Sequence, residues 1–353
     1  MADMPDAGVS DRETVACLLC GERDVEPVVE QRDFSDKESS ETFVVVRCRS
    51  CGLQYLNPRP TAAGIGRFYP PRYYTAAPQP RRIRRLKRRL MEVYYGYPPG
   101  GGTWAARIFW MVCLWPDYVW RWFRGKDVLP WIGRGRLLDV GCGPGVNLLT
   151  FRAQGWDVHG LDASATAVEA AAKLLGEGRV RLGELEALAY PDRSFDVVFF
   201  SHTLEHVHNP FAVLREARRI LDDKGRLVVM LPNAASCEAA LFGPWWWPWE
   251  LPRHLYHFDR ASLARLLAQA GFRIVRFRTG VGSLFFMASL ERAWQEQYGR
   301  PLPARRLWEW GVARPFGLFM GHAGYGSELM VYAEKAEPFA GQADMNEGGA
   351  GET

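Results

Sequence analysis

The middle of the chain alternates short apolar runs with amphipathic segments. Apolar runs suited to buried strands lie at 136–140, 157–161, 196–201, 226–231, 273–279 and 328–335. Helix start signals stand between them at Ser164, Asn209 with Pro210, and Asp259, and glycines at 155, 176 and 271 mark helix ends. This alternation predicts an α/β fold with a mostly parallel sheet.

The flanking regions follow other patterns. We expect a cysteine-bearing unit with its linker at 1–70, a basic and aromatic-rich helical cap at 71–132, and an α/β domain at 133–335. The segment 280–327 reads as a long insert in that domain, because compact domains seldom need so long a connection. Residues 336–353, rich in glycine, alanine and acidic groups, are expected to be a disordered acidic tail.

The stretch 243–258, GPWWWPWELPRHLYHF, fits neither a helical nor a strand period. Its prolines at 244, 248 and 252 remove backbone donors and push the preceding residues toward extended geometry. The sequence therefore predicts an irregular loop of large side chains.

The composition of the 353 residues is that of an ordinary globular protein, with 48% hydrophobic and 24% charged residues. Charges and a proline interrupt the most apolar region, 104–123, so a simple membrane span is not expected. No secretory signal is visible, which favours a cytoplasmic location. In that compartment the seven cysteines are expected to be thiols or metal ligands rather than disulfides.

Four cysteines form two pairs near the start of the chain. Cys17 and Cys20 are two residues apart, as are Cys48 and Cys51, and a glycine follows each pair. This spacing lets both sulfurs of a pair turn toward one ion, and four protein ligands suit structural zinc. The alternative is four unrelated thiols.

A glycine-rich turn, GCGPG, separates the first apolar run of the α/β domain from its helix. Such a turn lets a ligand approach the backbone amides closely. Asp162 ends the second run, where a carboxylate can accept hydrogen bonds from a ribose diol. A nicotinamide fingerprint would need a glycine at 146, where this chain has valine, so the pattern points to S-adenosylmethionine.

The passages LLDVGCGPG, GLDAS and RVRLGELEALAYPDRSFDVVFFSHTLEHVHNP resemble the class I S-adenosylmethionine-dependent methyltransferases. The resemblance covers about 133–335 and implies a Rossmann-like seven-stranded sheet with an antiparallel hairpin of the last two strands at its edge. It also implies a set of cofactor contacts, namely Asp139, Gly141, Gly143, Gly145, Asp162, Glu184, Leu185 and Ser201. With the cysteine unit, the chain is similar to bacterial methyltransferases that act on sugars and other small metabolites, while one ribosomal guanine methyltransferase type offers an RNA alternative.

Five of the seven histidines lie between 202 and 257, in the passages expected beyond the carboxyl ends of the strands. Transfer to a hydroxyl or carbon needs a group that removes a proton, and the candidates are His202, His254 and His257. The same passages offer candidate substrate contacts at His206, Trp245, Trp246, Trp247 and Tyr256. The alternative is that these histidines only pin the loops through backbone hydrogen bonds.

The run RRIRRLKRR at 81–89 precedes the aromatic-rich segment 104–123. Basic residues beside an aromatic amphipathic segment suit an anionic membrane surface, which would place the protein at the inner face of a membrane with a lipid-linked acceptor. A solvated helix face is the plain alternative, and RNA phosphate binding is the third.

These observations together predict S-adenosylmethionine-dependent methyl transfer, by in-line displacement, to a hydroxyl or carbon of a sugar, glycolipid or related small metabolite. An RNA methyltransferase is the first alternative. A non-catalytic module that keeps the fold for binding is the second.

Overall fold

The structure is a computed structural model that describes residues 11–36, 40–69, 85–98, 103–123 and 128–337. Its centre is a seven-stranded sheet in the order β12-β13-β10-β9-β6-β7-β8. The strands are β6 (Arg136–Val140), β7 (Asp157–Asp162), β8 (Val180–Leu182), β9 (Phe195–Ser201), β10 (Leu221–Pro232), β12 (Phe272–Thr279) and β13 (Glu328–Lys335). Six of them run in one direction, and β13 lies antiparallel between β10 and β12. The predicted α/β sheet with its antiparallel edge is confirmed.

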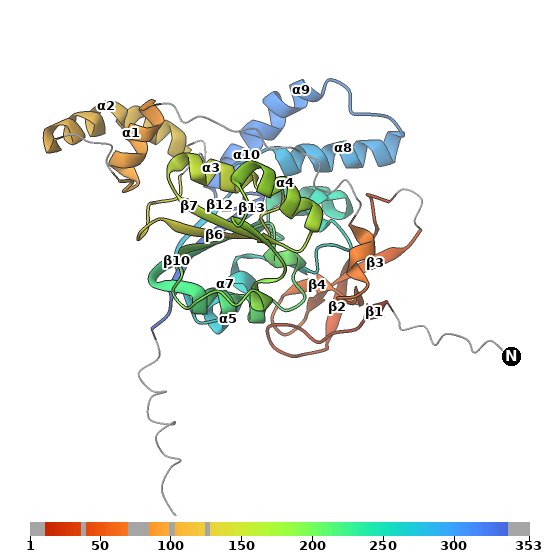
Figure 1. Cartoon of the computed structure of the whole chain (residues 1–353). Helices are drawn as coiled ribbons and strands as arrows, with labels where there is room; N and C mark the ends of the chain where they lie inside the picture. Colours follow the sequence, from red (N-terminus) through yellow and green to blue (C-terminus); the bar gives the residue numbers. More distant parts are fainter. Residues whose placement is uncertain (1–10, 37–39, 70–84, 99–102, 124–127, 338–353) are drawn as a thin grey trace, which may run out of the picture.

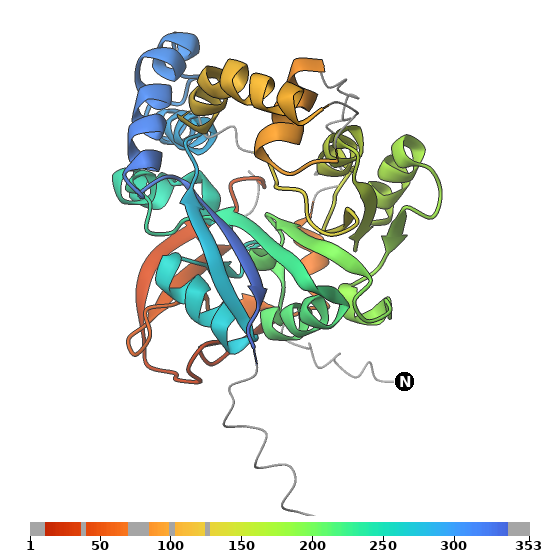
Figure 2. The same ribbon diagram turned by 90° about the vertical axis from the view of Figure 1, so that its left-hand side faces the viewer.

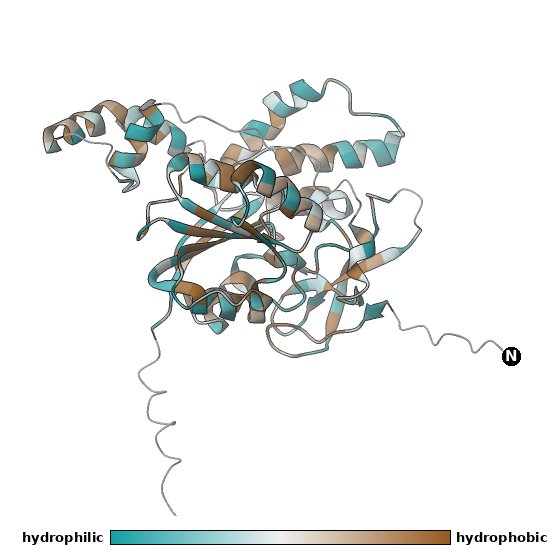
Figure 3. Cartoon of the chain, in the orientation of Figure 1, coloured by the Kyte–Doolittle hydropathy of each residue, from teal (hydrophilic) through white to brown (hydrophobic). Residues whose placement is uncertain are grey.

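Helices cover both faces of this sheet, as Figure 1 shows. The helices α3 (Val146–Gln154) and α4 (Ala165–Leu175) lie on one side, and α5 (Pro210–Ile220) and α7 (Arg260–Gln269) lie on the other. The expected start signals are real caps, because the side chains of Ser164, Asn209 and Asp259 each accept a backbone N–H of the first helical turn. Apolar residues fill the strands between the two helix layers (Figure 3).

The front unit is a four-stranded sheet in the order β11-β4-β3-β2, beside the short pair β1 (Arg12–Glu13) and β5 (Arg59–Pro60). Its strands are β2 (Val25–Arg32), β3 (Thr42–Cys48), β4 (Gln54–Leu56) and β11 (Tyr256–His257). The last strand comes from the stretch 243–258. A linker turn, η1 (Ile65–Phe68), follows the unit.

The stretch 243–258 is more regular than the sequence predicts. After α6 (Cys237–Phe242) it forms two 3₁₀ turns, η4 (Gly243–Trp245) and η5 (Trp247–Trp249), before β11. Tyr256 pairs with Tyr55, and Leu56 donates its N–H to the carbonyl of Leu255. The edge of β4 that β3 leaves unpaired is thus covered by a strand far along the chain, which a local pattern cannot show.

The predicted helical cap contains α1 (Arg85–Tyr94) and α2 (Trp104–Phe123), joined by a stack of Tyr94 on Tyr118 at 4.3 Å. Leu90 and Met91 of α1 are buried in the cluster that covers one face of the sheet. The insert forms α8 (Leu284–Tyr298), α9 (Arg305–Trp308), the π-turn η6 (Glu309–Ala313) and α10 (Arg314–His322). Both groups of helices lie at the same end of the molecule (Figure 2).

Among the described residues, no helix has the length and apolar character needed to cross a membrane. The first residues of the basic run, 81–84, and the predicted acidic tail from 338 onward lie outside the described residues. The boundaries of the four expected parts remain predictions.

Candidate functional site

The glycine turn after β6 adopts a backbone that other residues resist. Gly141, Gly143 and Gly145 have φ of 71°, 52° and 85°, in the left-handed region. A Cβ on Gly141 would stand 2.5 Å from the side chain of Thr203, whose hydroxyl donates to the carbonyl of Val140 at 2.9 Å. The turn is therefore a cradle that requires glycine at 141.

Two carboxylates lie under this turn. Asp139 is fully buried, and neither of its oxygens accepts a hydrogen bond within the part of the chain that the structure describes. Burial and the charge of Asp162 raise the pKa of Asp139 well above its usual range, and the nearby Asn147 side chain opposes this rise only in part. Asp162 accepts the N–H of Gly143 and of Ser164, both at 2.8 Å, and so ties the turn to the end of β7. The orphaned carboxylate of Asp139 calls for a polar or cationic ligand group.

The remaining predicted cofactor residues follow the next strands. Glu184 is exposed just after β8, Leu185 is buried at the start of η2 (Leu185–Ala187), and Ser201 ends β9. Because β6, β7, β8 and β9 are parallel, their carboxyl ends share one edge of the sheet. The structure thus gathers the eight residues at one edge, and their cofactor contacts remain predictions.

His202 follows β9 at the same edge and is held between two glutamates. It adopts a left-handed backbone with φ of 54°. Its Nε2 lies 3.0 Å from Oε1 of Glu328, and its Nδ1 lies 3.5 Å from Oε1 of Glu205. Burial lowers the pKa of His202, but the two carboxylates outweigh burial and raise it to about 10. The imidazole is therefore charged at neutral pH and has no lone pair with which to take a proton.

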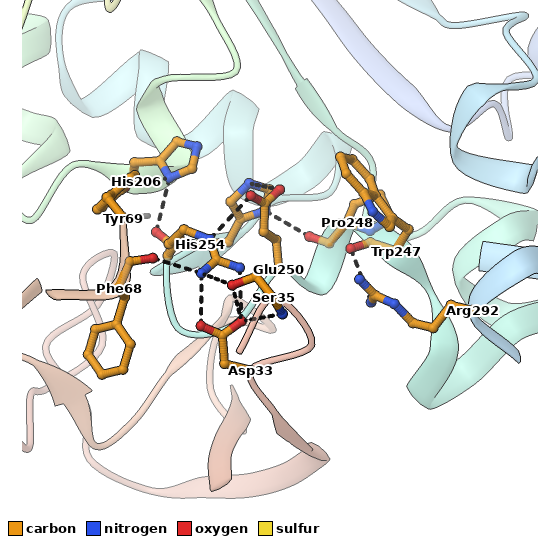
Figure 4. A network of polar contacts seen from close by, with 11 residues as sticks. Asp33, Ser35, Phe68, Tyr69, His206, Trp247, Pro248, Glu250, His254 and Arg292 are labelled. Carbon is orange, nitrogen blue, oxygen red and sulfur yellow. Dashed lines mark hydrogen bonds and ion pairs between the residues drawn. The ribbon is translucent and has the colours of Figure 1, made fainter. Parts of the chain in front are cut away.

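His254 lies deeper, in a cluster with Glu205 and His206. Figure 4 shows the two histidines of this cluster. One ligand-type atom from each of the three side chains lies within 4.8 Å of the other two. The Nδ1 of His254 is 2.7 Å from the carbonyl oxygen of Pro248. Since a carbonyl only accepts, Nδ1 carries a proton, and Nε2 lies 3.5 Å from Oε2 of Glu250.

His206 belongs to the turn η3 (Leu204–His206) and stands edge-on to His254, with ring centres 4.5 Å apart. Its Nδ1 lies 3.1 Å from the carbonyl oxygen of Arg253 and 3.1 Å from the hydroxyl of Tyr69. Burial and the neighbouring His254 lower the pKa of His206 to about 4. The sequence analysis did not predict Tyr69 as a residue of this site. The feature that could have pointed to it is the aromatic passage FYPPRYY in the linker.

His257 and Tyr256 of β11 have different surroundings. His257 is buried, its ring lies 4.8 Å from that of Trp249, and burial depresses its pKa well below the usual value. The Tyr256 hydroxyl accepts from Arg59 at 2.9 Å and donates to the carbonyl of His208 at 3.2 Å. Both residues tie the stretch 243–258 to the front unit, and their contact with substrate remains a prediction.

The three consecutive tryptophans differ in exposure. Trp246 is fully buried against Trp249, whereas Trp245 is 42% exposed. Trp247 is part-buried, stacks on Phe285 of α8 at 5.6 Å, and donates its backbone N–H to the hydroxyl of Ser289. Trp245 and Trp247 are therefore the two tryptophans of this run with surface left for another molecule.

Residues 121–276 match the methyltransferase-domain family. This match, together with the strand order and the glycine cradle, identifies the type of domain. The chain contains a class I methyltransferase domain.

Two relatives illustrate the methyltransferase match. The chain is 34% identical over 116 residues to the demethylmenaquinone methyltransferase of Thermotoga maritima, covering 32% of this chain and 50% of that protein. It is 31% identical over 156 residues to a ubiquinone biosynthesis O-methyltransferase of a Chelativorans species, covering 41% and 61%. The chain thus spans about half the length of the curated relatives that it matches.

Solved methyltransferase structures are also similar. The S-adenosylmethionine-dependent methyltransferase of Mesorhizobium loti has a TM-score of 0.40 and 20% identity, covering 63% of this chain and 97% of that one.

The methyltransferase domain's usual cofactor, S-adenosylmethionine, fits the residues present. The cradle at Gly141 has no room for a side chain, and the buried Asp139 accepts no hydrogen bond of normal geometry among the described residues, although the Asn147 side chain lies near it. Both features are what a polar ligand lying on the turn would require.

Outside the methyltransferase domain, the four predicted metal-binding cysteines converge. The Sγ of Cys17 lies 3.3 Å from that of Cys51, and the Sγ of Cys20 lies 3.5 Å from that of Cys48. Sulfurs on a tetrahedral zinc at ~2.3 Å are about 3.8 Å apart, so small shifts suffice. The cluster has the donor set and size of a closed four-cysteine metal site.

A hollow of about 390 Å³ lies elsewhere, beside α1, where Glu92, Trp131 and Arg152 contribute to its walls. It adjoins Gly155, just before β7 begins, and so opens at the amino end of the strands. The cofactor residues lie at the opposite edge, and this hollow is not part of the methyltransferase site.

Proposed function

We propose that the protein transfers a methyl group from S-adenosylmethionine to a hydroxyl or carbon of a sugar, glycolipid or related small metabolite. The observation that carries the proposal is the pairing of a glycine cradle and an orphaned Asp139 with histidines at the same sheet edge. The demethylmenaquinone and ubiquinone-biosynthesis relatives support a small-molecule acceptor.

We assign cofactor binding to the turn 141–145, with Asp139 and Asp162 beneath it and Glu184, Leu185 and Ser201 along the edge. When bound, S-adenosylmethionine supplies an electrophilic methyl group on a sulfonium. The positive charge of a sulfonium and an amino group suits a site lined by the carboxylates of Asp139 and Asp162.

Among the predicted catalytic histidines, His254 is the one we assign to proton removal. Its Nδ1–H is fixed by the carbonyl of Pro248, which leaves Nε2 as the basic nitrogen. His202 is paired with Glu205 and Glu328, and as a cation it would orient an acceptor oxygen rather than take its proton. His257 lies behind Trp249. Trp245 and Trp247 would form an apolar wall of the acceptor pocket.

We also propose that Cys17, Cys20, Cys48 and Cys51 hold a structural zinc ion. Such an ion would stiffen the front sheet to which β11 adds, and thereby position the stretch that carries His254. Four protein ligands leave no coordination position for a substrate, so this unit serves the site from a distance.

A membrane surface is the partner that we propose for α2. Its exposed apolar side chains are Trp104, Ile108, Phe109, Met111, Val112, Trp115, Val119 and Trp120. A surface helix normally packs its apolar side chains against the core of the protein. Those of α2 face outward instead, on a helix that stands away from the sheet (Figure 3). Arg88 and Arg107 are exposed on the same helix pair, which suits anionic headgroups and a lipid-linked acceptor.

The direct test is transfer of label from methyl-labelled S-adenosylmethionine into a fractionated extract of the native cell. We expect label in the soluble-sugar or lipid fraction, lost in His254→Ala and kept in His159→Ala, a histidine on β7. Label in RNA would support the RNA alternative instead. Cofactor binding without any transfer would support the non-catalytic module.

A further inference from the structure

Glu205 is a buried carboxylate whose charged partner is the imidazolium of His202. It is 1% exposed, and neither oxygen accepts a hydrogen bond from any residue in the described ranges. The nearest cation is His202, whose Nδ1 lies 3.5 Å from one oxygen, beyond normal hydrogen-bond distance for a charged pair. A carboxylate buried in this way is costly unless it binds a cation or a donor.

The two histidines beside Glu205 are arranged as metal ligands usually are. His254 donates from Nδ1 to the carbonyl of Pro248, and His206 places its Nδ1 on the carbonyl of Arg253. A backbone carbonyl on one ring nitrogen fixes the tautomer and leaves the other nitrogen with a lone pair. Both rings are held by rigid backbone, and they face each other edge-on at 4.5 Å.

We propose that Glu205, His206 and His254 bind a divalent transition-metal ion, separate from the four-cysteine site. One ligand atom from each lies within 4.8 Å of the others, and ligands at ~2.1 Å from one ion are about 3–4 Å apart. Side-chain movements of about an ångström would therefore bring the three ligand atoms within reach of one ion. Two imidazoles and a carboxylate without thiolate suit zinc, iron, cobalt or manganese.

Three protein ligands leave a coordination position for an oxygen. The site adjoins His202 at the edge where the acceptor is proposed to bind, so that position suits an acceptor hydroxyl, whose pKa a bound cation lowers. This role rests on the proposed function, whereas metal binding itself does not. The ion and a proton would use the same nitrogen of His254, so metal binding moves acceptor activation from the histidine to the ion.

Cobalt(II) titration of the intact protein, with its four-cysteine site already filled by zinc, separates the two sites. We expect one added equivalent with weak visible absorption and no thiolate charge-transfer band. Glu205→Gln and His254→Gln should each abolish this signal, while His159→Ala keeps it. Thermal melting and S-adenosylmethionine binding show that the variants are folded.

The proposal is overturned if the native protein binds no cobalt at this position, or if binding persists in both folded variants. A thiolate charge-transfer band as the sole signal also overturns it. Cobalt binding at the expected site without methyl transfer would sustain the metal site and count against the proposed function, so the two failures are distinguishable.

Discussion

The guanidinium of Arg253 donates to both carboxylate oxygens of Asp33, at 2.9 and 3.1 Å, across 220 residues of sequence. Each side chain is 4% exposed. Arg253 also donates to the hydroxyl of Ser35 and the carbonyl of Phe68, so the front unit and its linker turn surround the guanidinium. Figure 4 shows Asp33, Ser35 and Phe68 gathered on this side of His254. His254 directly follows Arg253 in the chain. The front unit therefore fixes the position of the histidine cluster in the methyltransferase domain.

Removing one partner of this buried pair should destabilise the protein strongly. Asp33→Ala removes the bidentate partner of the buried Arg253 and leaves Glu250, at 3.3 Å, as its carboxylate. We expect a loss of about 3 kcal/mol in the free energy of unfolding. Denaturant titration measures it. The double variant Asp33→Leu with Arg253→Met should recover most of that loss.

The surface pair of Arg49 and Glu26 provides the control, because Glu26→Gln should change the same free energy by less than about 1 kcal/mol. Equal effects of Asp33→Ala and Glu26→Gln would show that the buried pair does not hold the front unit in place.

Local patterns predicted most of the methyltransferase domain. The caps at Ser164, Asn209 and Asp259 and the turn at 141–145 depend on residues within one turn of each other, and all were visible in the sequence. The four-cysteine cluster could also be predicted, because the spacing within each cysteine pair is visible in a short stretch of sequence.

The long-range parts of the site could not be predicted. Tyr69 reaches His206 across 137 residues, and β11 completes a sheet that begins before residue 60. These contacts depend on how two separately patterned units pack, and no local period encodes that packing. The burial of Trp246 between more exposed neighbours has the same origin.

Asp196 should make stability depend on acid pH. Burial raises its pKa, but hydrogen bonds from the Arg136 side chain and backbone and from the Arg134 backbone outweigh burial, so its pKa lies below the usual value. This stabilisation is present above the unfolded pKa of about 3.9 and is lost as pH falls through the lower folded pKa.

We therefore expect Asp196→Asn to be less stable than the native protein at pH 7. The difference in melting temperature between the two proteins should narrow below about pH 4. Thermal melting across pH 2–7 measures this, and Asp192→Asn, at an exposed ion pair, serves as the control. A difference in melting temperature that stays constant with pH would contradict the lowered pKa of Asp196.

Loss of one cysteine should empty the front metal site. Cys48 is fully buried in the cluster, and Cys48→Ser is expected to remove one zinc per chain and lower the melting temperature. Metal analysis of the purified protein measures the stoichiometry. Cys113→Ser, at an exposed thiol on α2, should leave the zinc content unchanged. Equal zinc in both variants would refute the site.

Trp247 should affect the acceptor more than the cofactor. Trp247→Ala removes the ring stacked on Phe285, and we expect kcat/KM for the acceptor to fall at least about tenfold with cofactor affinity unchanged. Trp120→Ala on α2 is the control for a soluble acceptor. Weaker cofactor binding with normal acceptor use would place Trp247 away from the acceptor.

Cofactor binding at the glycine cradle can be tested by calorimetric titration with S-adenosylmethionine. Gly141→Ala puts a methyl group 2.5 Å from Thr203, while Gly155→Ala has the same positive φ problem but meets no atom within 4 Å. We predict one cofactor molecule per chain, with binding lost in Gly141→Ala and kept in Gly155→Ala. No binding to the native protein, or equal binding in both variants, would contradict the account.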